Sequence, residues 1–262
     1  MRKRLTWTLV LGTVLAVACA GIAIAGKHPK GKPTIIKEGN LELKLNGGFS
    51  PTKLPKKKLA PIHLNIEGEI NSLDGSHPPP LTEVIVETDK NGTINAKGLA
   101  KCTAGKLAAR TTNAALKACK PSLVGEGTTD VEIAFPEQKP FIIHSKLLAF
   151  NGGVSGGKTT IFIHAFLSNP VSAAVVTTVK VSKIHNGRYG TKSIATIPPI
   201  AGDGAVRKFQ LEFFRMFTYK GKKQSYLLAK CPDGKLQAKA ESIFREGPRM
   251  VGTFKRPCTP KG

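Results

Sequence analysis

Only one stretch of the chain, residues 102–119, has the composition of a helix, and nearly everything around it has the composition of β-strands. Thr103 is a suitable N-cap for the alanine- and leucine-rich run that follows, and residues 111–113 interrupt that run with poor helix formers. Cys102 and Cys119 close the stretch at its two ends. The sequence therefore predicts a small helical insert, residues 102–120, in an otherwise mainly β chain.

The two cysteines constrain the shape of this insert. One continuous helix over the stretch would hold its ends about 25 Å apart, because a helix rises about 1.5 Å per residue. A disulfide needs Cα atoms roughly 4.4–6.8 Å apart. A bridge between Cys102 and Cys119 therefore requires two short antiparallel helices hinged at residues 111–113. The alternative is one bent helix whose cysteines pair elsewhere.

The first 25 residues have the features of a secretory signal peptide. Basic residues at positions 2–4 precede a long apolar run, which ends in an Ala-Ile-Ala cleavage site at Ala25. An uncleaved membrane anchor is the alternative, since the run is close to membrane-spanning length, and Cys19 leaves lipoprotein processing open. Cleavage after Ala25 predicts a secreted or cell-envelope protein with no membrane span in its mature form.

Export favours disulfides among the four cysteines that remain after cleavage. Four cysteines allow three connectivities, and we expect the sequence-local pairs, Cys102 with Cys119 and Cys231 with Cys258. The second pair depends on a predicted meander over residues 225–255, in which both cysteines fall at the same end of neighbouring strands. None of the four has the spacing of a zinc site, so the sequence predicts no metal site and no cofactor.

The rest of the chain favours an antiparallel β-sandwich. Residues 41–46 and 62–70 alternate between apolar and polar side chains, as half-buried strands do. Residues 159–168 and 172–184 are rich in Val, Ile, Thr and Phe, which favour strands, and residues 206–220 are predicted to form one long strand. Ten or more such strands with hairpin-length loops, and no strand–helix–strand rhythm, predict a single sandwich domain over residues 59–262.

Basic residues dominate the charge of the chain. The formal net charge is +23, and the signal peptide holds three basic and no acidic residues, so the mature chain carries +20. Residues 26–58 are rich in Lys, Gly and Pro, and we expect a basic, partly disordered arm with one short strand there. Such a charge attracts polyanions, among them anionic cell-wall polymers, anionic lipid and extracellular nucleic acid. The alternative is that the lysines only keep a β-protein soluble and protect its edges.

Residues 152–159 match the phosphate-loop pattern GxxxxGK[ST], but the match does not predict nucleotide binding. The motif needs a following helix whose N-terminal amides hold the phosphates. Residues 160–166 have the composition of a strand instead. A glycine-rich hairpin loop explains the whole stretch.

The remaining candidate catalytic groups do not form a recognisable site. His144 and His164 are predicted to face each other across this hairpin, but two histidines without a third ligand make a poor metal site. Asp203 and Glu212 could act as a carboxylate pair only if the fold brought them together. The sequence contains no nucleophile elbow and no zinc-protease motif, so it assigns no catalytic residue.

Three segments of the chain resemble a sequence pattern that other proteins share. They are C-T-A-G-K-L…T-T-N-A-A-L-K-A-C…L-V-G-E-G at residues 102–127, CPDGKL at 231–236 and FKRPC at 254–258. The pattern is similar to that of secreted β-rich proteins of high-GC Gram-positive (actinobacterial) bacteria, a group with no assigned activity. The resemblance covers most of the chain from about residue 59 onward. It implies export and a shared fold, and it transfers no catalytic residue.

These observations favour a non-enzymatic, exported protein that acts at the cell envelope as a binding or structural module. The alternatives are a carbohydrate-active enzyme on a sandwich fold and a polyanion-binding protein. Surface aromatics beside two facing carboxylates would favour the enzyme. Aromatic residues make up only 6% of the chain, and its one tryptophan lies in the signal peptide, which argues against sugar-binding platforms.

Overall fold

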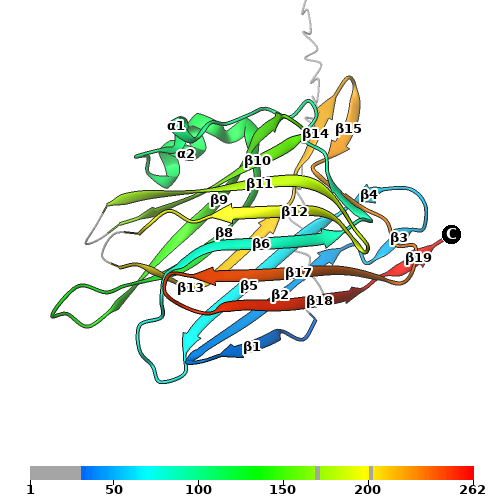
Figure 1. Cartoon of the computed structure of the whole chain (residues 1–262). Helices are drawn as coiled ribbons and strands as arrows, with labels where there is room; N and C mark the ends of the chain where they lie inside the picture. Colours follow the sequence, from blue (N-terminus) through cyan, green and yellow to red (C-terminus); the bar gives the residue numbers. More distant parts are fainter. Residues whose placement is uncertain (1–30, 169–171, 201–202) are drawn as a thin grey trace, which may run out of the picture.

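The computed structural model describes residues 31–168, 172–200 and 203–262, so the predicted signal peptide lies outside the described residues. Twelve strands form one large sheet and shorter strands form three small ones (Figure 1). The prediction of a mainly β chain with antiparallel strands is confirmed. In their order across the large sheet, the strands are β1 (Thr34–Glu38), β2 (Leu41–Ser50), β5 (His63–Ser72), β13 (Ala205–Phe213), β8 (Leu123–Ile133), β9 (Phe141–Ser155), β10 (Lys158–Leu167), β11 (Ala173–Asn186), β12 (Tyr189–Thr196), β6 (Leu81–Asp89), β17 (Lys235–Phe244) and β18 (Arg249–Pro257).

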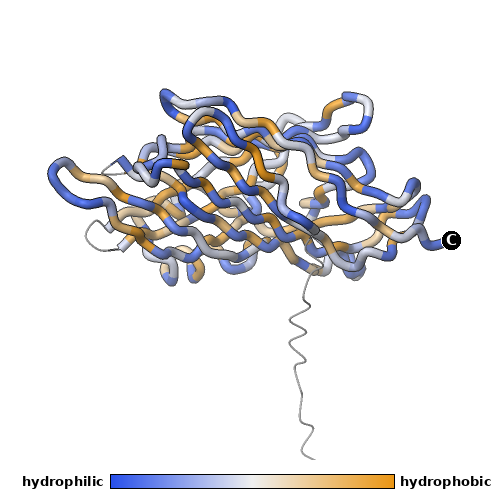
Figure 2. The backbone as a smooth tube through the Cα atoms, turned by 90° about the horizontal axis from the view of Figure 1, so that it is seen from below, coloured by the Kyte–Doolittle hydropathy of each residue, from blue (hydrophilic) through white to orange (hydrophobic). Residues whose placement is uncertain are grey.

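The large sheet curls so that its two ends meet. Leu43 in β2 shares one buried cluster with Ala240 in β17 and Met250 in β18, which lie at the opposite end of the strand order. A Cβ atom built at Gly252 in β18 would lie 2.6 Å from the side chain of Ile36 in β1, so the two edge strands are in contact. Successive side chains of a strand point to opposite faces, and apolar and polar residues alternate along much of the strand backbone (Figure 2). The apolar faces line the interior of the curl.

The structure does not confirm the predicted sandwich of two sheets. The long strands of the described chain belong to one continuous sheet, and its interior is closed by the approach of β18 to β1. Alternation in the sequence shows which side of a strand faces a core. It does not show whether the next strand extends the same sheet or begins a second one.

The N-terminal segment is not a separate arm. β2 pairs with β5 along all ten of its residues, and β1 pairs with β2. A further strand, β3 (Lys53–Pro55), runs parallel to β19 (Thr259–Lys261) near the C-terminus. The prediction of a partly disordered arm with one short strand is therefore wrong for residues 33–58, and residues 26–30 lie outside the described part. The prediction gave too much weight to the lysines of this segment. Leu54 lies between them in the sequence, and its completely buried side chain fixes the segment to the core.

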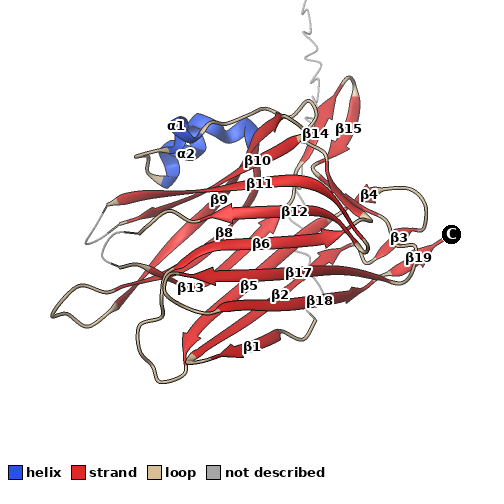
Figure 3. Ribbon diagram, in the orientation of Figure 1, coloured by secondary structure: helices blue, strands red, loops and turns tan. Residues whose placement is uncertain are grey.

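Two short helices cover the outer face of β9, β10 and β11 (Figure 3). They are α1 (Ala104–Leu107) and α2 (Thr112–Cys119), and a 3-10 turn, η1 (Lys120–Ser122), follows. The chain leaves the helical path at residues 108–111, slightly before the predicted hinge at 111–113. Thr111 caps α2, because its side-chain oxygen accepts a hydrogen bond from the amide of Ala114 at 3.3 Å.

The C-terminal third of the chain departs from its prediction. The single strand expected over residues 206–220 ends at Phe213, and the chain continues as β14 (Met216–Tyr219), which pairs with β15 (Lys222–Ser225). The expected meander is half right. Its last two strands pair as predicted, because β17 pairs with β18, and β17 also pairs with β6. Its first strand is misplaced, since β16 (Leu227–Ala229) pairs with β4 (Ala60–Pro61) and β7 (Gly92–Ile94). Segments far apart in the sequence supply these partners, so sequence order misled the prediction.

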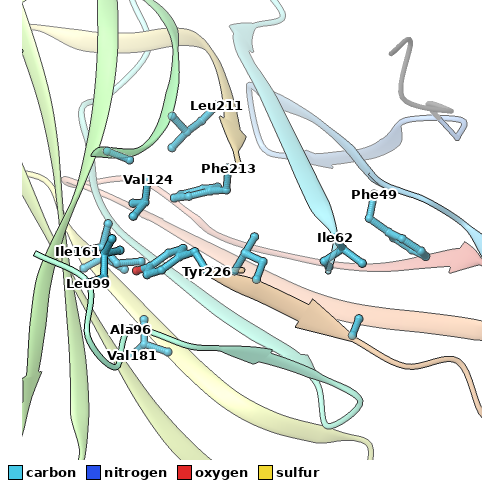
Figure 4. Close-up of a cluster of buried hydrophobic side chains, with 14 of the residues drawn as sticks. Phe49, Ile62, Ala96, Leu99, Val124, Ile161, Val181, Leu211, Phe213 and Tyr226 are labelled. Carbon is cyan, nitrogen blue, oxygen red and sulfur yellow. The ribbon is translucent and has the colours of Figure 1, made fainter. Parts of the chain in front are cut away.

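Tyr226 lies at the centre of the largest buried cluster, beside Leu99 and Phe213 (Figure 4). Its side chain is fully buried, and its hydroxyl finds no hydrogen-bond partner among the described residues. Burial raises the pKa of this hydroxyl far above its ordinary value near 10. The same cluster includes Leu54 and Cys231, so it connects the interior of the curled sheet to the end that carries β3 and β19.

Candidate functional site

Three segments that are distant in sequence meet at one end of the molecule. The amide of Lys56 donates to the carbonyl of Lys261 at 3.2 Å, and the amide of Cys231 donates to the carbonyl of Pro55 at 2.9 Å. Residues 52–58, 230–235 and 255–261 therefore lie side by side, at the end that bears the C-terminus (Figure 1). We call this surface the basic pole. Its basic residues are Lys53, Lys56, Lys57, Lys58, Lys230, Lys235, Lys255, Arg256 and Lys261.

The charge of the basic pole is not neutralised from within. All of its lysines except the half-buried Lys230 are exposed, and none of them forms an ion pair with a described residue. One acidic residue, Asp233, lies in the three segments, and its carboxylate accepts hydrogen bonds from Arg188. These hydrogen bonds lower the pKa of the Asp233 carboxyl, and the negative charge of Asp233 is paired with the guanidinium of Arg188. Seven exposed lysines thus lie around one acid that is already engaged.

The outer face of the large sheet offers a contrast, because its charges alternate. Lys44 lies opposite Glu69, and Glu69 lies opposite Lys208 on the next strand. Lys208 in turn lies opposite Asp130, which lies opposite His144. Opposite charges on neighbouring strands attract each other. This face is therefore close to electrically balanced, and the excess positive charge of the chain is concentrated elsewhere.

Both disulfides join the sequence-local cysteines. Cys231 and Cys258 have Cα atoms 6.1 Å apart, and their bond ties β19 and the 230–235 segment together within the basic pole. Cys102 and Cys119 have Cα atoms 5.6 Å apart and hold α1 against α2. The position of the Cys231–Cys258 bond agrees with the predicted hairpin of residues 235–244 and 250–255, because Lys235 at the start of β17 lies opposite Pro257 at the end of β18.

The two histidines of the β9–β10 hairpin do not face each other. His144 lies opposite Asp130, with 2.7 Å between its Nδ1 and the carboxylate, and its side chain is largely exposed. His164 lies opposite Leu148 and is fully buried beneath the helices. Its Nε2 donates to the carbonyl of Arg110 at 2.9 Å. The prediction of a facing pair is wrong, because the two residues occupy different positions along the hairpin.

We expect His164 to make the stability of the protein depend on pH. Burial lowers the pKa of His164 below its ordinary value near 6.5. Below this pH the unfolded chain takes up a proton that the folded protein does not, so the free energy of unfolding falls as the pH is lowered. His164→Gln retains a donor for the Arg110 carbonyl and removes this titration. Urea denaturation at several pH values should show that the free energy of unfolding falls less steeply below about pH 6.5 in the variant, and equal losses would contradict the assignment.

The carboxylates considered in the sequence are not paired with each other. The carboxylate of Asp203 binds the guanidinium of Arg245. Glu212 in β13 lies opposite Glu126 in β8, and both line a shallow hollow of about 320 Å³ together with Lys146. The sequence prediction missed Glu126. The alternating glycines of the V-G-E-G motif marked this stretch, but they gave no indication of the strand that lies beside it.

The phosphate-loop match lies at a tight hairpin. β9 ends at Ser155 and β10 begins at Lys158, with Gly156 and Gly157 between them at φ values of 55° and 74°. The positive φ values explain why glycine occupies both positions. A strand follows the loop, so the amides of a helix N-terminus do not face it.

Two further features concern membranes and metals. In the ranges that the structure covers, no helix combines the length and the hydropathy needed to cross a membrane. Nor do the described His, Cys, Asp and Glu side chains form a group of three or more that could hold a metal ion.

Searches of family models, curated proteins and solved structures return no match to this chain.

Proposed function

We propose that the protein is exported and acts at the cell envelope or outside the cell as a non-enzymatic binding module for anionic polymers. The observation that carries this proposal is the basic pole, where nine basic residues gather around one engaged acid. Lysines that serve solubility alone are usually interspersed with acids, as on the outer face of the sheet. A patch of one sign raises the local concentration of oppositely charged ligands.

Export is supported by the N-terminal 25 residues and by the disulfides. Disulfides persist in oxidising compartments outside the cytosol. Within this proposal, residues 102–120 are a disulfide-pinned helical insert that covers part of the outer face of the sheet, over β9, β10 and β11. N-terminal sequencing of the protein recovered from an expressing culture is expected to begin at Gly26, and a start at Met1 or Cys19 would contradict cleavage at Ala25.

Retention on an immobilised sulfated polysaccharide tests the polyanion proposal. Replacing Lys56, Lys57 and Lys58 with glutamine should lower the salt concentration at which the protein elutes, because fewer polymer counterions are released on binding. The matched control replaces Lys106, Lys117 and Lys120 with glutamine, which changes the net charge equally on the helical segment. Glutamine and lysine have similar helix propensities. Equal shifts in the two variants, or no shift in either, would contradict a binding role for the basic pole.

A carbohydrate-active enzyme is the second candidate, and one observation favours it. Glu126 and Glu212 lie directly opposite each other on neighbouring strands, a placement that brings Cβ atoms to about 4.5–5.5 Å. Retaining glycosidases hold their two carboxyl groups about 5–5.5 Å apart, and side chains that start this close together can reach that separation. The hollow that they share has no aromatic residue in its lining. Release of reducing ends from cell-wall glycan, abolished in Glu126→Gln, would favour the enzyme over the binding module.

A further inference from the structure

We infer that the helical insert, residues 102–120, is an acid-responsive flap that lies closed over β9, β10 and β11 at neutral pH and opens when His164 is protonated. Both ends of the flap stay attached to the sheet when it opens. The flap is separate from the basic pole, so it operates whatever that surface binds. Three features of the structure support the flap: the way the insert is attached, the strain in its loop and the surroundings of His164.

The base of the flap is firmly attached to the sheet. The amide of Cys102 donates to the carbonyl of Asn151 in β9 at 2.8 Å. At the other end, β8 begins at Leu123, directly after η1. The disulfide between Cys102 and Cys119 joins the two ends of the insert. The base therefore acts as a hinge that the disulfide keeps intact.

The far end of the flap, the loop over residues 108–111, is attached more weakly. In the described structure, residues 103–119 make one hydrogen bond to the sheet, which His164 Nε2 donates to the carbonyl of Arg110 at 2.9 Å. Ala109, next to this acceptor, has a φ of 54°. This left-handed conformation is unfavourable for a residue with a Cβ atom. Opening would release that strain, so the loop depends on its contact with His164.

His164 has apolar neighbours on both sides. It is fully buried, and it lies opposite Leu148 on β9 and opposite Val176 on β11. Both of these residues belong to the buried cluster that includes Leu107 and Ala115 of the helices. Nδ1 of His164 has no hydrogen-bond partner among the described residues. A proton on Nδ1 would place a charge and an unpaired donor in this apolar space, which is costly.

The elements packed around His164 cannot neutralise that charge. β9, β10, β11 and the insert contain no acidic residue. Their ionisable side chains are all basic: His144 and Lys146 on β9, Lys158 on β10, Lys180, Lys183 and His185 on β11, and Lys106, Arg110, Lys117 and Lys120 on the insert. The charge is relieved only when water reaches the ring. The three strands are held by backbone ladders on both sides, so the insert is the part that moves.

The direction of the pH response follows from the two states of the flap. In the closed flap, burial lowers the pKa of His164 below its ordinary value near 6.5. In the open flap, water surrounds the ring and the pKa returns to the ordinary range. The open state therefore binds a proton that the closed state does not. The equilibrium constant for opening should rise by up to about tenfold for each pH unit below about 6.5, and the flap stays closed above it.

Hydrogen exchange of the folded protein between pH 7.5 and 4.5 tests the flap, with rates corrected for the intrinsic effect of pH. A helix as short as α2 is not stable without packing, so its amides lose protection when the flap opens. At every pH below 6.5, we expect the opening constant of the α2 amides to be at least about tenfold larger than that of the β8 and β9 amides. A return to pH 7.5 should restore the protection of α2, because the hinge keeps the flap beside its seat.

Two variants assign the response to one histidine. His164→Gln should make the opening constant of α2 nearly independent of pH. His144→Gln replaces an exposed histidine on the same hairpin and should retain the response of the natural protein. Equal opening constants for α2 and the strands would mean that the insert detaches only on global unfolding, and would overturn the inference. An unchanged pH response in His164→Gln would overturn it as well.

An NMR titration of the natural protein covers the case in which His164→Gln does not fold. The imidazole carbon shifts of His164 report protonation of the ring directly. Protonation should follow the loss of α2 protection across the same pH range. Protonation of His164 while α2 remains fully protected would show that the closed flap tolerates the charge, and the flap would not be a pH-dependent device.

Discussion

Gly127→Ala is expected to lower the free energy of unfolding by about 3 kcal/mol. Gly127 lies in β8, which is paired with β13 on one side and β9 on the other. A Cβ atom at this position would lie 1.9 Å from the carbonyl oxygen of Gln210 and 2.9 Å from the Cα of Leu211. Both belong to the backbone of β13, so no side-chain rotation can relieve the clash. The two central strands would have to separate, and the melting temperature should fall by roughly 6–12 °C.

The matched control for this change is Gly105→Ala. Gly105 lies in α1, and a Cβ atom there would meet nothing within 4 Å. Alanine is a better helix former than glycine, so the control should be neutral or slightly stabilising. Thermal denaturation followed by circular dichroism measures both variants. A loss in Gly127→Ala no larger than that in Gly105→Ala would show that the close approach of β8 and β13 is not a requirement of the fold.

Glu132→Ala is expected to lower the free energy of unfolding by about 2–3 kcal/mol. The carboxylate of Glu132 binds Nδ1 of His77 at 2.7 Å and the guanidinium of Arg207. All three side chains are mostly buried, and removal of one partner from a buried ion pair typically costs 3–5 kcal/mol. Arg207 keeps the carbonyl of Ile70 and the side chain of Asn71 as acceptors. The expected cost therefore lies at or below the lower end of that range.

Glu126→Ala provides the control for Glu132. Glu126 lies on the same strand and the same face, it is exposed, and it forms no ion pair with a described residue. Its removal should change stability by no more than about 0.5 kcal/mol. Glu132→Gln should fall between the two alanine variants, because it keeps the shape but loses the charge. Urea denaturation measures all three, and similar losses in Glu126→Ala and Glu132→Ala would contradict a stabilising role for the buried network.

The glycines near residue 126 show how far a sequence can be interpreted on its own. In the sequence, Gly125 and Gly127 indicate a turn between two segments of secondary structure. In the structure both lie inside β8, where β13 passes too close for any side chain. Either a turn or a close approach of two backbones can require a glycine. Here the requirement comes from the backbone of β13, which is 80 or more residues away in the chain.

The same limit applies to the candidate site. Each lysine-rich segment of the basic pole is visible in the sequence, and the arm that contains residues 53–58 was expected to attract polyanions. The sequence did not indicate that this segment pairs with the last residues of the chain. Likewise, Glu212 was noted, but its partner across the strands is Glu126 and not Asp203. Such pairings depend on strand order, which local patterns do not encode.

Local features of the chain were determined by the sequence alone. Alternation of apolar and polar residues marked β2 and β5, and residues 102–119 contain the two helices. These features depend on near neighbours, whose geometry is set by backbone preferences and side-chain period. The single curled sheet, the burial of His164 and the assembly of the basic pole were decided by the tertiary structure. They depend on which distant segments share a sheet, and many pairings bury similar apolar faces, so only packing of the whole chain selects among them.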